Sequence, residues 1–540
     1  MNEIELVLLL MVVVAALTPV ARALRVPYPV LLVVGGLILA LIPAVPGIEL
    51  TPELVFLLFL PPLVYHAAFT TSVRDFRLLF RPILSLAVGL VLATTAVVAI
   101  LLHTIMPDLG WPVAFAFGAI VSPPDAVAAA AVFRGLGVPR RIVTLLEGES
   151  LINDATALVT YRAALGAVAV AFSAEEASAR FVVVAAGGVL VGLVIAIFIN
   201  KLERRIDDPP VEITLSLLAP FATYLPAELL GVSGVLAAVT AGLFLGWRAP
   251  YVTRSDARLR GRAVWDMVEF ILNGLVFILI GLQLATILPT LEGRSMLSLI
   301  GLGLLISLTL VAVRMVWVFG DAYIRLWLAR FKLSRHPNRE PNTNDLNPSW
   351  RGLVVVGWAG MRGVVSLAAV LSLPSNTPER NLLIFLTFFV ILATLVGQGL
   401  TLPLLIRTLG VGADSSITLQ QEQFARRTAT EAAITRIERL RAEWPTHAPL
   451  IDTLRVQYDH RASHLGYGSN GASDNTQDGN GAGDPEQIDQ ELLEHHMIRR
   501  AVIEAERSAV LELRERGEIE DAIWTELERD FDLEELRMDA

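Results

Sequence analysis

Long apolar runs alternate with short polar segments through the first 410 residues of the chain. Most of these runs are close to the roughly 20 residues that a helix needs to cross a bilayer. The pattern predicts an all-α polytopic membrane protein, followed by a mostly helical polar tail. We expect about thirteen transmembrane helices, at residues 4–23, 27–42, 52–70, 82–105, 112–133, 144–172, 181–201, 211–230, 233–248, 265–289, 297–328, 351–374 and 382–408.

Basic residues concentrate in every second loop. The loops after the odd-numbered spans carry most of the Arg and Lys, whereas the opposite loops contain only Arg180, Arg294 and Arg380. Because positively charged loops stay in the cytosol, the N-terminus is expected outside and the tail inside the cell. The first run has no basic segment before it, which favours an uncleaved span over a signal peptide. We therefore expect a multi-pass protein of the plasma (inner) membrane.

The C-terminal part has a different composition. Residues 411–540 contain 28 acidic residues against 14 arginines, which makes nucleic-acid binding unexpected. Residues 415–462 and 488–537 are predicted to be helical, and the Gly/Ser/Asn/Asp-rich stretch 466–487 is predicted to be a flexible linker. The chain is thus divided into a transmembrane domain, 1–410, and an acidic cytosolic tail, 411–540. It contains no cysteine, which excludes disulfides and thiolate metal sites.

One predicted span begins with an unusual group of polar residues. The segment 147–159 reads Glu-Gly-Glu-Ser-Leu-Ile-Asn-Asp-Ala-Thr-Ala-Leu-Val. On a helix, Glu149 and Asn153 share a face, and Asp154 lies about 100° further round. A charge at membrane depth costs roughly 3 to 10 kcal/mol, so such residues usually mark an ion or proton path. The alternative, acids that complement the helix dipole at the interface, suits Glu147 better than Asp154.

Two predicted spans contain helix-breaking motifs. Ser122-Pro123-Pro124-Asp125 removes two backbone donors and also resembles a helix start, so this span is expected to end and restart within the membrane. A Pro kink in which Asp125 serves only as a helix cap is the alternative. Broken backbone at this depth is tolerated only where it lines a cavity or is packed in protein.

The second motif surrounds an arginine with glycines, in Gly357-Trp-Ala-Gly360-Met-Arg362-Gly363. Interrupted spans at corresponding places in two halves are typical of transporters with inverted repeats. Spans 1–6 and 8–13 would form two inverted six-helix repeats with two broken crossing helices. A membrane-buried arginine needs a partner, for which the acids of span 6 are candidates. The remaining polar residues inside spans are interpreted as structural: Asp266, Glu269, Asn273, Arg314 and Asp321.

These motifs resemble those of the sodium/proton exchangers of the cation:proton antiporter superfamily, over about residues 1–410. The resemblance implies a homodimer, in which each protomer has a dimerisation domain and a six-helix ion-carrying core. Many relatives have Thr-Asp-Pro where this chain has Pro-Pro-Asp, which leaves the role of Asp125 open.

The resemblance also implies residue roles. Asp154 would bind either sodium or a proton, and Asn153 matches the Asn-Asp form associated with electroneutral exchange. Glu149 and Ser150 match positions that support the ion site, and Arg362 matches the arginine that pairs with Glu149. Sodium prefers oxygen ligands, which Asp154, Asp125, Ser122 and Ser150 would supply together with carbonyls freed in the broken span.

A single carboxylate that binds one sodium or one proton couples the two flows by competition, which predicts 1:1 exchange for pH and sodium homeostasis. Potassium or lithium as the main cation is an alternative, and a cation channel is another, because polar broken helices also line pores. The chain has neither a His-Glu-x-x-His metalloprotease motif nor a Walker A loop. We therefore expect no enzyme activity, no ATP and no cofactor, and membrane lipid as a partner.

Overall fold

The computed structural model describes residues 3–24, 26–42, 52, 55–133, 136–169, 174–283, 287–291, 294–335, 349–412, 415–464 and 485–539. Within these ranges every regular element is helical and no strand occurs. This confirms the prediction of an all-helical fold. Apolar runs favour helices in lipid, because a helix forms the hydrogen bonds of its backbone groups internally. The chain divides into two compact units: unit 1 is Met1–Thr253 and Ala263–Ala413, and unit 2 is Arg254–Arg262 and Asp414–Ala540.

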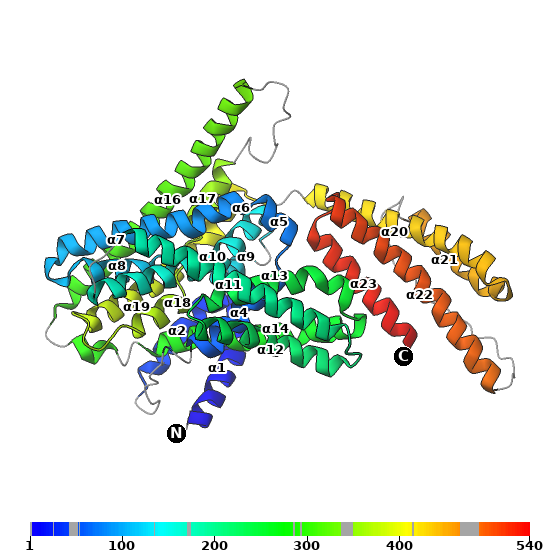
Figure 1. Cartoon of the computed structure of the whole chain (residues 1–540), viewed down its shortest axis with the longest axis horizontal. Coiled ribbons are helices and arrows are strands. Elements are labelled where there is room, and N and C mark those ends of the chain that lie inside the picture. The colour runs from blue at the N-terminus through cyan, green and yellow to red at the C-terminus, as the bar shows by residue number, and fades with distance from the viewer. Residues whose placement is uncertain are drawn as a thin grey trace. The chain divides into compact units, whose positions relative to one another are not determined.

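Unit 1 contains the apolar helices (Figure 1). In chain order they are α1 (Glu3–Leu24), α2 (Tyr28–Ala40), η1 (Val55–Phe59), α4 (Leu60–Thr70), α5 (Val73–Leu78), α6 (Phe80–Leu84), η2 (Ser85–Leu90), α7 (Val91–Ile105), α8 (Trp111–Val121), α9 (Ala126–Phe133), α10 (Arg140–Ala169), α11 (Ala174–Glu203), α12 (Pro209–Leu229), α13 (Gly234–Val252), α16 (Met296–Arg335), α17 (Trp350–Trp358), α18 (Val364–Leu371) and α19 (Arg380–Leu409). Helix α14 (Ser255–Leu282) has residues in both units.

Eight helical stretches in the described ranges are long and apolar enough to cross a membrane. They are Val7–Leu24, Phe80–Ile105, Trp111–Phe133, Ser178–Glu203, Gly234–Val252, Ser255–Leu282, Met296–Leu328 and Arg380–Leu409. Tyr28–Ala40 and Val55–Thr70 are shorter apolar helices. Helices also cover the other predicted spans, as α10, α12 and the pair α17 and α18. The total of thirteen spans and the inverted repeat stay predictions.

Both motifs singled out in the sequence interrupt helices. Helix α8 ends at Val121 and α9 begins at Ala126, while α17 ends at Trp358 and α18 begins at Val364. Close packing around them depends on small residues: a Cβ on Gly118 of α8 would collide with the Thr95 carbonyl of α7. These two helices lie side by side (Figure 1).

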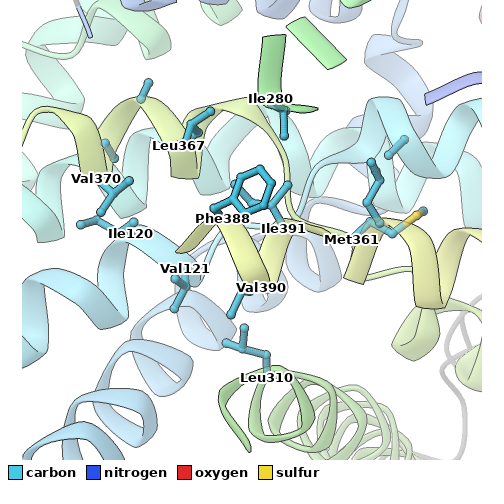
Figure 2. Close-up of a cluster of buried hydrophobic side chains, with 14 of the residues drawn as sticks. Ile120, Val121, Ile280, Leu310, Met361, Leu367, Val370, Phe388, Val390 and Ile391 are labelled. Carbon is cyan, nitrogen blue, oxygen red and sulfur yellow. The ribbon is translucent and has the colours of Figure 1, made fainter. Parts of the chain in front are cut away.

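Apolar side chains pack around the two interruptions. Figure 2 shows part of this cluster, with Val121 at the end of α8, Leu367 on α18, and Phe388 and Ile391 on α19. All four side chains are at most 1% exposed. Tight apolar packing fixes the broken ends in position, because buried side chains fill their space at crystal-like density.

Unit 2 contains α20 (Ser415–Glu443), α21 (Ala448–His464), α22 (Pro485–Arg516) and α23 (Asp521–Asp539). Helices α20 and α22 lie side by side (Figure 1). The predicted helix 415–462 is interrupted before Pro445, and the helix predicted at 488–537 is divided at Gly517, whose φ of 78° suits a residue without a Cβ. Of the predicted linker, residues 466–484 lie outside the described residues, and 485–487 begin α22.

The boundary predicted at residue 410 did not anticipate that unit 2 also takes residues 254–262. Within unit 2, Arg258 donates to Asp532 at 3.1 Å, and Arg262 donates to Glu528 at 2.5 Å. The sequence shows Arg258 and Arg262 only as loop cations, because their carboxylate partners lie more than 260 positions away along the chain.

Candidate functional site

The two interrupted segments meet at their breaks, a place called the crossing below, and are joined there by hydrogen bonds. The backbone N–H of Asp125, between α8 and α9, donates to the Met361 carbonyl, between α17 and α18, at 2.7 Å. In the reverse direction, Nε of Arg362 donates to the Val121 carbonyl at 3.0 Å. The backbone N–H of Arg362 also donates to the Thr394 hydroxyl on α19 at 3.1 Å. The break in each span is thus held by the break in the other.

Helix N-termini and helix C-termini both lie at the crossing. A helix C-terminus carries partial negative charge and an N-terminus partial positive charge. The Arg362 guanidinium donates to the carbonyls of Val121 and Gly360, close to the C-terminal ends of α8 and α17. The Asp125 carboxylate accepts the Val127 N–H at 2.8 Å, at the start of α9. Each charged side chain therefore complements the helix ends that it contacts.

A cavity of about 310 Å³ adjoins the crossing. Asp125, Ser150, Asp154, Gly363 and Ser366 line it, and so do further acids and an amide. Asp154 and Ser150 are four residues apart on α10 and so share a face. The other polar lining residues are His66, Thr70, Glu147, Asp266, Glu269 and Asn273. The cavity brings together hard oxygen donors and anionic charge, the combination that attracts a small cation.

Three residues that the sequence analysis assigns to the ion site, Ser122, Asn153 and Glu149, do not line this cavity. The Ser122 hydroxyl donates to the Ala119 carbonyl at 3.0 Å, and the Asn153 amide donates to the Pro124 carbonyl at 2.8 Å. Glu149 is fully buried and forms an ion pair. The carbonyl of Ala119, one of those that the broken span frees, is therefore already bonded. Ser122 and Asn153 satisfy the broken backbone, because a buried carbonyl without a donor is costly.

The predicted pair between Glu149 and Arg362 is wrong. The partner of Glu149 is Arg314 on α16, which donates to both carboxylate oxygens, at 2.5 and 2.8 Å. Nε of Arg314 donates to the Val356 carbonyl at 3.1 Å. Arg362 instead donates to the carbonyls of Val121 and Gly360, which the two broken spans leave free. The sequence analysis interprets Arg314 only as a structural residue, because the resemblance to known exchangers assigns the pair with Glu149 to Arg362.

Part of the cavity is formed by residues to which the sequence analysis gives no role at the ion site. Asn273 donates to Glu269, four residues away on α14, at 3.4 Å, and both residues also line the cavity. His66 lies 3.6 Å from the Glu269 carboxylate and stacks on Trp265, with ring centroids 4.8 Å apart. The sequence did not indicate a role for His66, because a single histidine in an apolar span forms no recognisable motif. Among the described residues, no group of three or more His, Cys, Asp or Glu side chains is placed to hold a metal ion.

Comparison with known proteins identifies the family. A family model described as "Sodium/hydrogen exchanger, transmembrane" matches residues 9–408. An uncharacterized Na⁺/H⁺ exchanger of Mycobacterium tuberculosis is 33% identical over 528 residues, which cover 95% of this chain and 92% of that protein. A sodium, potassium, lithium and rubidium/H⁺ antiporter of Bacillus pumilus is 38% identical over 397 residues, which cover 70% of this chain and 58% of that protein.

A solved structure has a similar fold. The sodium proton antiporter MjNhaP1 of Methanocaldococcus jannaschii matches with a TM-score of 0.56 and 21% sequence identity. The match covers 76% of this chain and 98% of that protein. At this identity the likeness shows a common fold, and the roles of individual residues depend on the geometry described above.

Proposed function

Since the chain belongs to the sodium/hydrogen exchanger family and exchanges sodium for protons across a membrane, we propose that Asp154 is the carboxylate that both ions share. The observation that carries this proposal is the cavity at the helix crossing, where Asp154 lies with Asp125 and Ser150. Asp154 is only 8% exposed, so a bare charge there is unfavourable and the carboxylate needs a bound cation or a proton.

Competition at Asp154 couples the two flows. Sodium, a hard cation, binds the carboxylate oxygens of Asp154 and Asp125 and the Ser150 hydroxyl. A proton on Asp154 removes the charge that holds sodium, so the site carries one ion or the other. In either case the ion site moves across the membrane with the Asp154 charge neutralised, which avoids the cost of moving a bare charge through the membrane.

Exchange is one sodium for one proton and electroneutral in this proposal. Asn153 carries no titratable proton, and its amide is engaged with the Pro124 carbonyl. Asp125 caps the start of α9 through the Val127 N–H and serves in this proposal as a fixed ligand of the cation. Glu149 is occupied by its ion pair with Arg314. In this proposal Asp154 is the one carboxylate that exchanges its proton for sodium.

The orientation follows from charge in the loops. We place the N-terminus outside and the tail in the cytosol of a plasma (inner) membrane protein, because the basic loops lie on the tail's side. Glu147 and Asp266 line the cavity and lie close in sequence to Arg140 and Arg262 of those loops. In this proposed orientation, Glu147 and Asp266 lie on the cytosolic side of the cavity. A homodimer is also proposed, and its support is the family resemblance.

A second candidate function is exchange of several alkali cations. The Bacillus pumilus relative is named for sodium, potassium, lithium and rubidium, and it aligns with 70% of this chain. Carboxylate and hydroxyl oxygens bind all of these ions, so the cavity's donor set does not by itself select sodium. Proton movement in proteoliposomes after separate sodium, potassium and lithium pulses distinguishes the two candidates.

The test of stoichiometry uses proteoliposomes with a fixed sodium gradient, clamped by potassium and valinomycin. A second proton per sodium would move one net charge, worth about 2.3 kcal/mol per 100 mV, and shift the equilibrium pH gradient accordingly. One-for-one exchange leaves that gradient the same at zero and at about −100 mV. A voltage-dependent equilibrium would refute electroneutrality, while flux that never saturates and dissipates any gradient would indicate a channel.

A further inference from the structure

Ser366 is a buried hydroxyl in the wall of the cavity. It lies in the first turn of α18 and is 1% exposed. Among the residues that the structure describes, its Oγ has no hydrogen-bond partner, although the residue lines the cavity with Asp154 and Asp125. Buried hydroxyls are almost always bonded, because an unmade hydrogen bond is unfavourable. An unbonded Oγ in the wall of a cation cavity indicates an oxygen reserved for a ligand.

The packing of α18 brings this hydroxyl to the carboxylates. A Cβ on Gly363 would collide with the Asp125 carboxylate, so α18 begins in direct contact with Asp125. Ser366 follows Gly363 by three residues and therefore lies on the same side of the helix. Both residues line the cavity.

Neighbouring hydroxyls differ from Ser366 in having protein partners. Ser122 donates to the Ala119 carbonyl, and Thr394 accepts from Arg362 and donates to the Val390 carbonyl. Ser372, at the other end of α18, bonds to Tyr161 at 2.9 Å. Ser150 accepts the Ala126 N–H at 3.4 Å, a long bond that leaves a lone pair for a cation.

We propose that the Ser366 hydroxyl is a ligand of the transported cation, contributed by the second broken helix and acting together with Asp154 and Asp125. This inference rests on the proposed function of the cavity. A hydroxyl oxygen adds a ligand without adding charge, so it leaves the one-for-one exchange unchanged. A proton on Asp154 needs no such ligand. Ser366 therefore strengthens the binding of the cation relative to the proton.

The test compares Ser366→Ala with Ser366→Cys in proteoliposomes. Both lose the oxygen, but Cys keeps the volume, and its sulfur is a poor ligand for sodium. Loss of one neutral ligand, comparable to a hydrogen bond, should raise the KM for sodium by about 3- to 10-fold in both variants. The maximal rate at saturating sodium is expected to stay the same. Ser372→Ala on the same helix is the control, and its KM should not change.

The outcomes separate this inference from the function on which it rests. An unchanged sodium KM in either folded variant overturns the role of Ser366, and a raised KM for Ala alone indicates packing and also overturns it. If Ser366→Ala does not insert, Ser366→Cys decides the question. Asp154→Asn is measured in parallel: if it still exchanges sodium for protons, the proposed shared site fails whatever Ser366 does.

Discussion

Arg314 and Glu149 form a two-point ion pair within unit 1, with both side chains 1% exposed. Each Nη atom donates to one carboxylate oxygen, at 2.5 and 2.8 Å. The third donor of Arg314, Nε, is taken by the Val356 carbonyl of α17. The pair therefore joins α10, α16 and α17, the helices that carry the acid motif and one half of the second broken span.

Removal of either partner should destabilise the protein, because the remaining charge is left buried and uncompensated. Arg314→Ala and Glu149→Gln are each expected to lower the free energy of unfolding by about 3–5 kcal/mol. Thermal unfolding in detergent measures the effect. Arg325→Gln is the control, since Arg325 forms a partly exposed pair with Asp321, and its loss should cost less than about 1 kcal/mol. Equal melting temperatures for all three would contradict the inferred role of the buried pair.

Asp154→Asn should separate transport from stability. The change keeps the size of the side chain but removes the only group proposed to bind both ions, so sodium-driven proton flux is expected to fall to the background of empty liposomes. Thermal stability should not decrease, because a neutral amide is easier to bury than a carboxylate. A well-folded Asp154→Asn protein with substantial exchange would disprove the shared site.

The sequence was most informative where the backbone itself is unusual. Consecutive prolines at 123 and 124 cannot continue a hydrogen-bonded helix, and glycines at 360 and 363 weaken one, so both interruptions were predictable from local chemistry. Asp154 in the wall of the cavity was recognisable as a functional residue, because a charged side chain between apolar residues is costly in a membrane and usually has a functional role.

The sequence did not predict which residues of distant spans pair with each other. Arg314 and Arg362 both lie in apolar surroundings, and either satisfied the rule that a buried arginine needs a partner. The packing of the helices determines which arginine pairs with Glu149. At the crossing Arg362 donates to the Val121 carbonyl, whereas Arg314 on α16 forms the ion pair with Glu149. Ser366 gave no signal for a related reason, since a serine in an apolar helix usually bonds to its own backbone.

Gly363→Ala should impair exchange through a collision at the crossing. A Cβ there would overlap the Asp125 carboxylate, so either Asp125 or the start of α18 must move. Because cavity geometry limits transport, we expect the maximal exchange rate to fall at least about 10-fold, as small displacements of reacting groups have effects of this size. Gly397→Ala on α19 is the matched control, since a Cβ at that position meets nothing within 4 Å. The prediction fails if the two variants exchange at the same rate.

Glu506 in unit 2 should make the stability of that unit depend on pH. Its side chain is 2% exposed and accepts a hydrogen bond from the Tyr458 hydroxyl at 2.9 Å, with Arg461 3.5 Å away. Burial raises the pKa of Glu506 from 4.5 to about 8, and the nearby Glu534 carboxylate also raises it, against the opposing effects of Arg461 and of the Tyr458 hydrogen bond. The folded unit therefore holds a proton that the unfolded chain releases.

The sign of the effect follows from this difference. A group whose pKa is higher in the folded state contributes stability below its unfolded pKa and loses it as the pH rises through the folded value. Between pH 7 and pH 9, unit 2 should lose about 1.4 kcal/mol of stability through Glu506. Hydrogen exchange of α22 peptides in the full-length protein, corrected for the intrinsic rate at each pH, measures this loss.

Glu506→Gln is expected to remove most of this pH dependence, because the amide is neutral at both pH values while it keeps the shape and an acceptor for Tyr458. Glu512→Gln is the matched control on the same helix, since Glu512 is 60% exposed and pairs with Arg516 on the surface. It should retain the pH dependence of the parent protein. If protection of α22 falls equally with pH in Glu506→Gln and in the parent protein, the buried carboxyl is not the group that titrates, and another acid of unit 2 must be responsible.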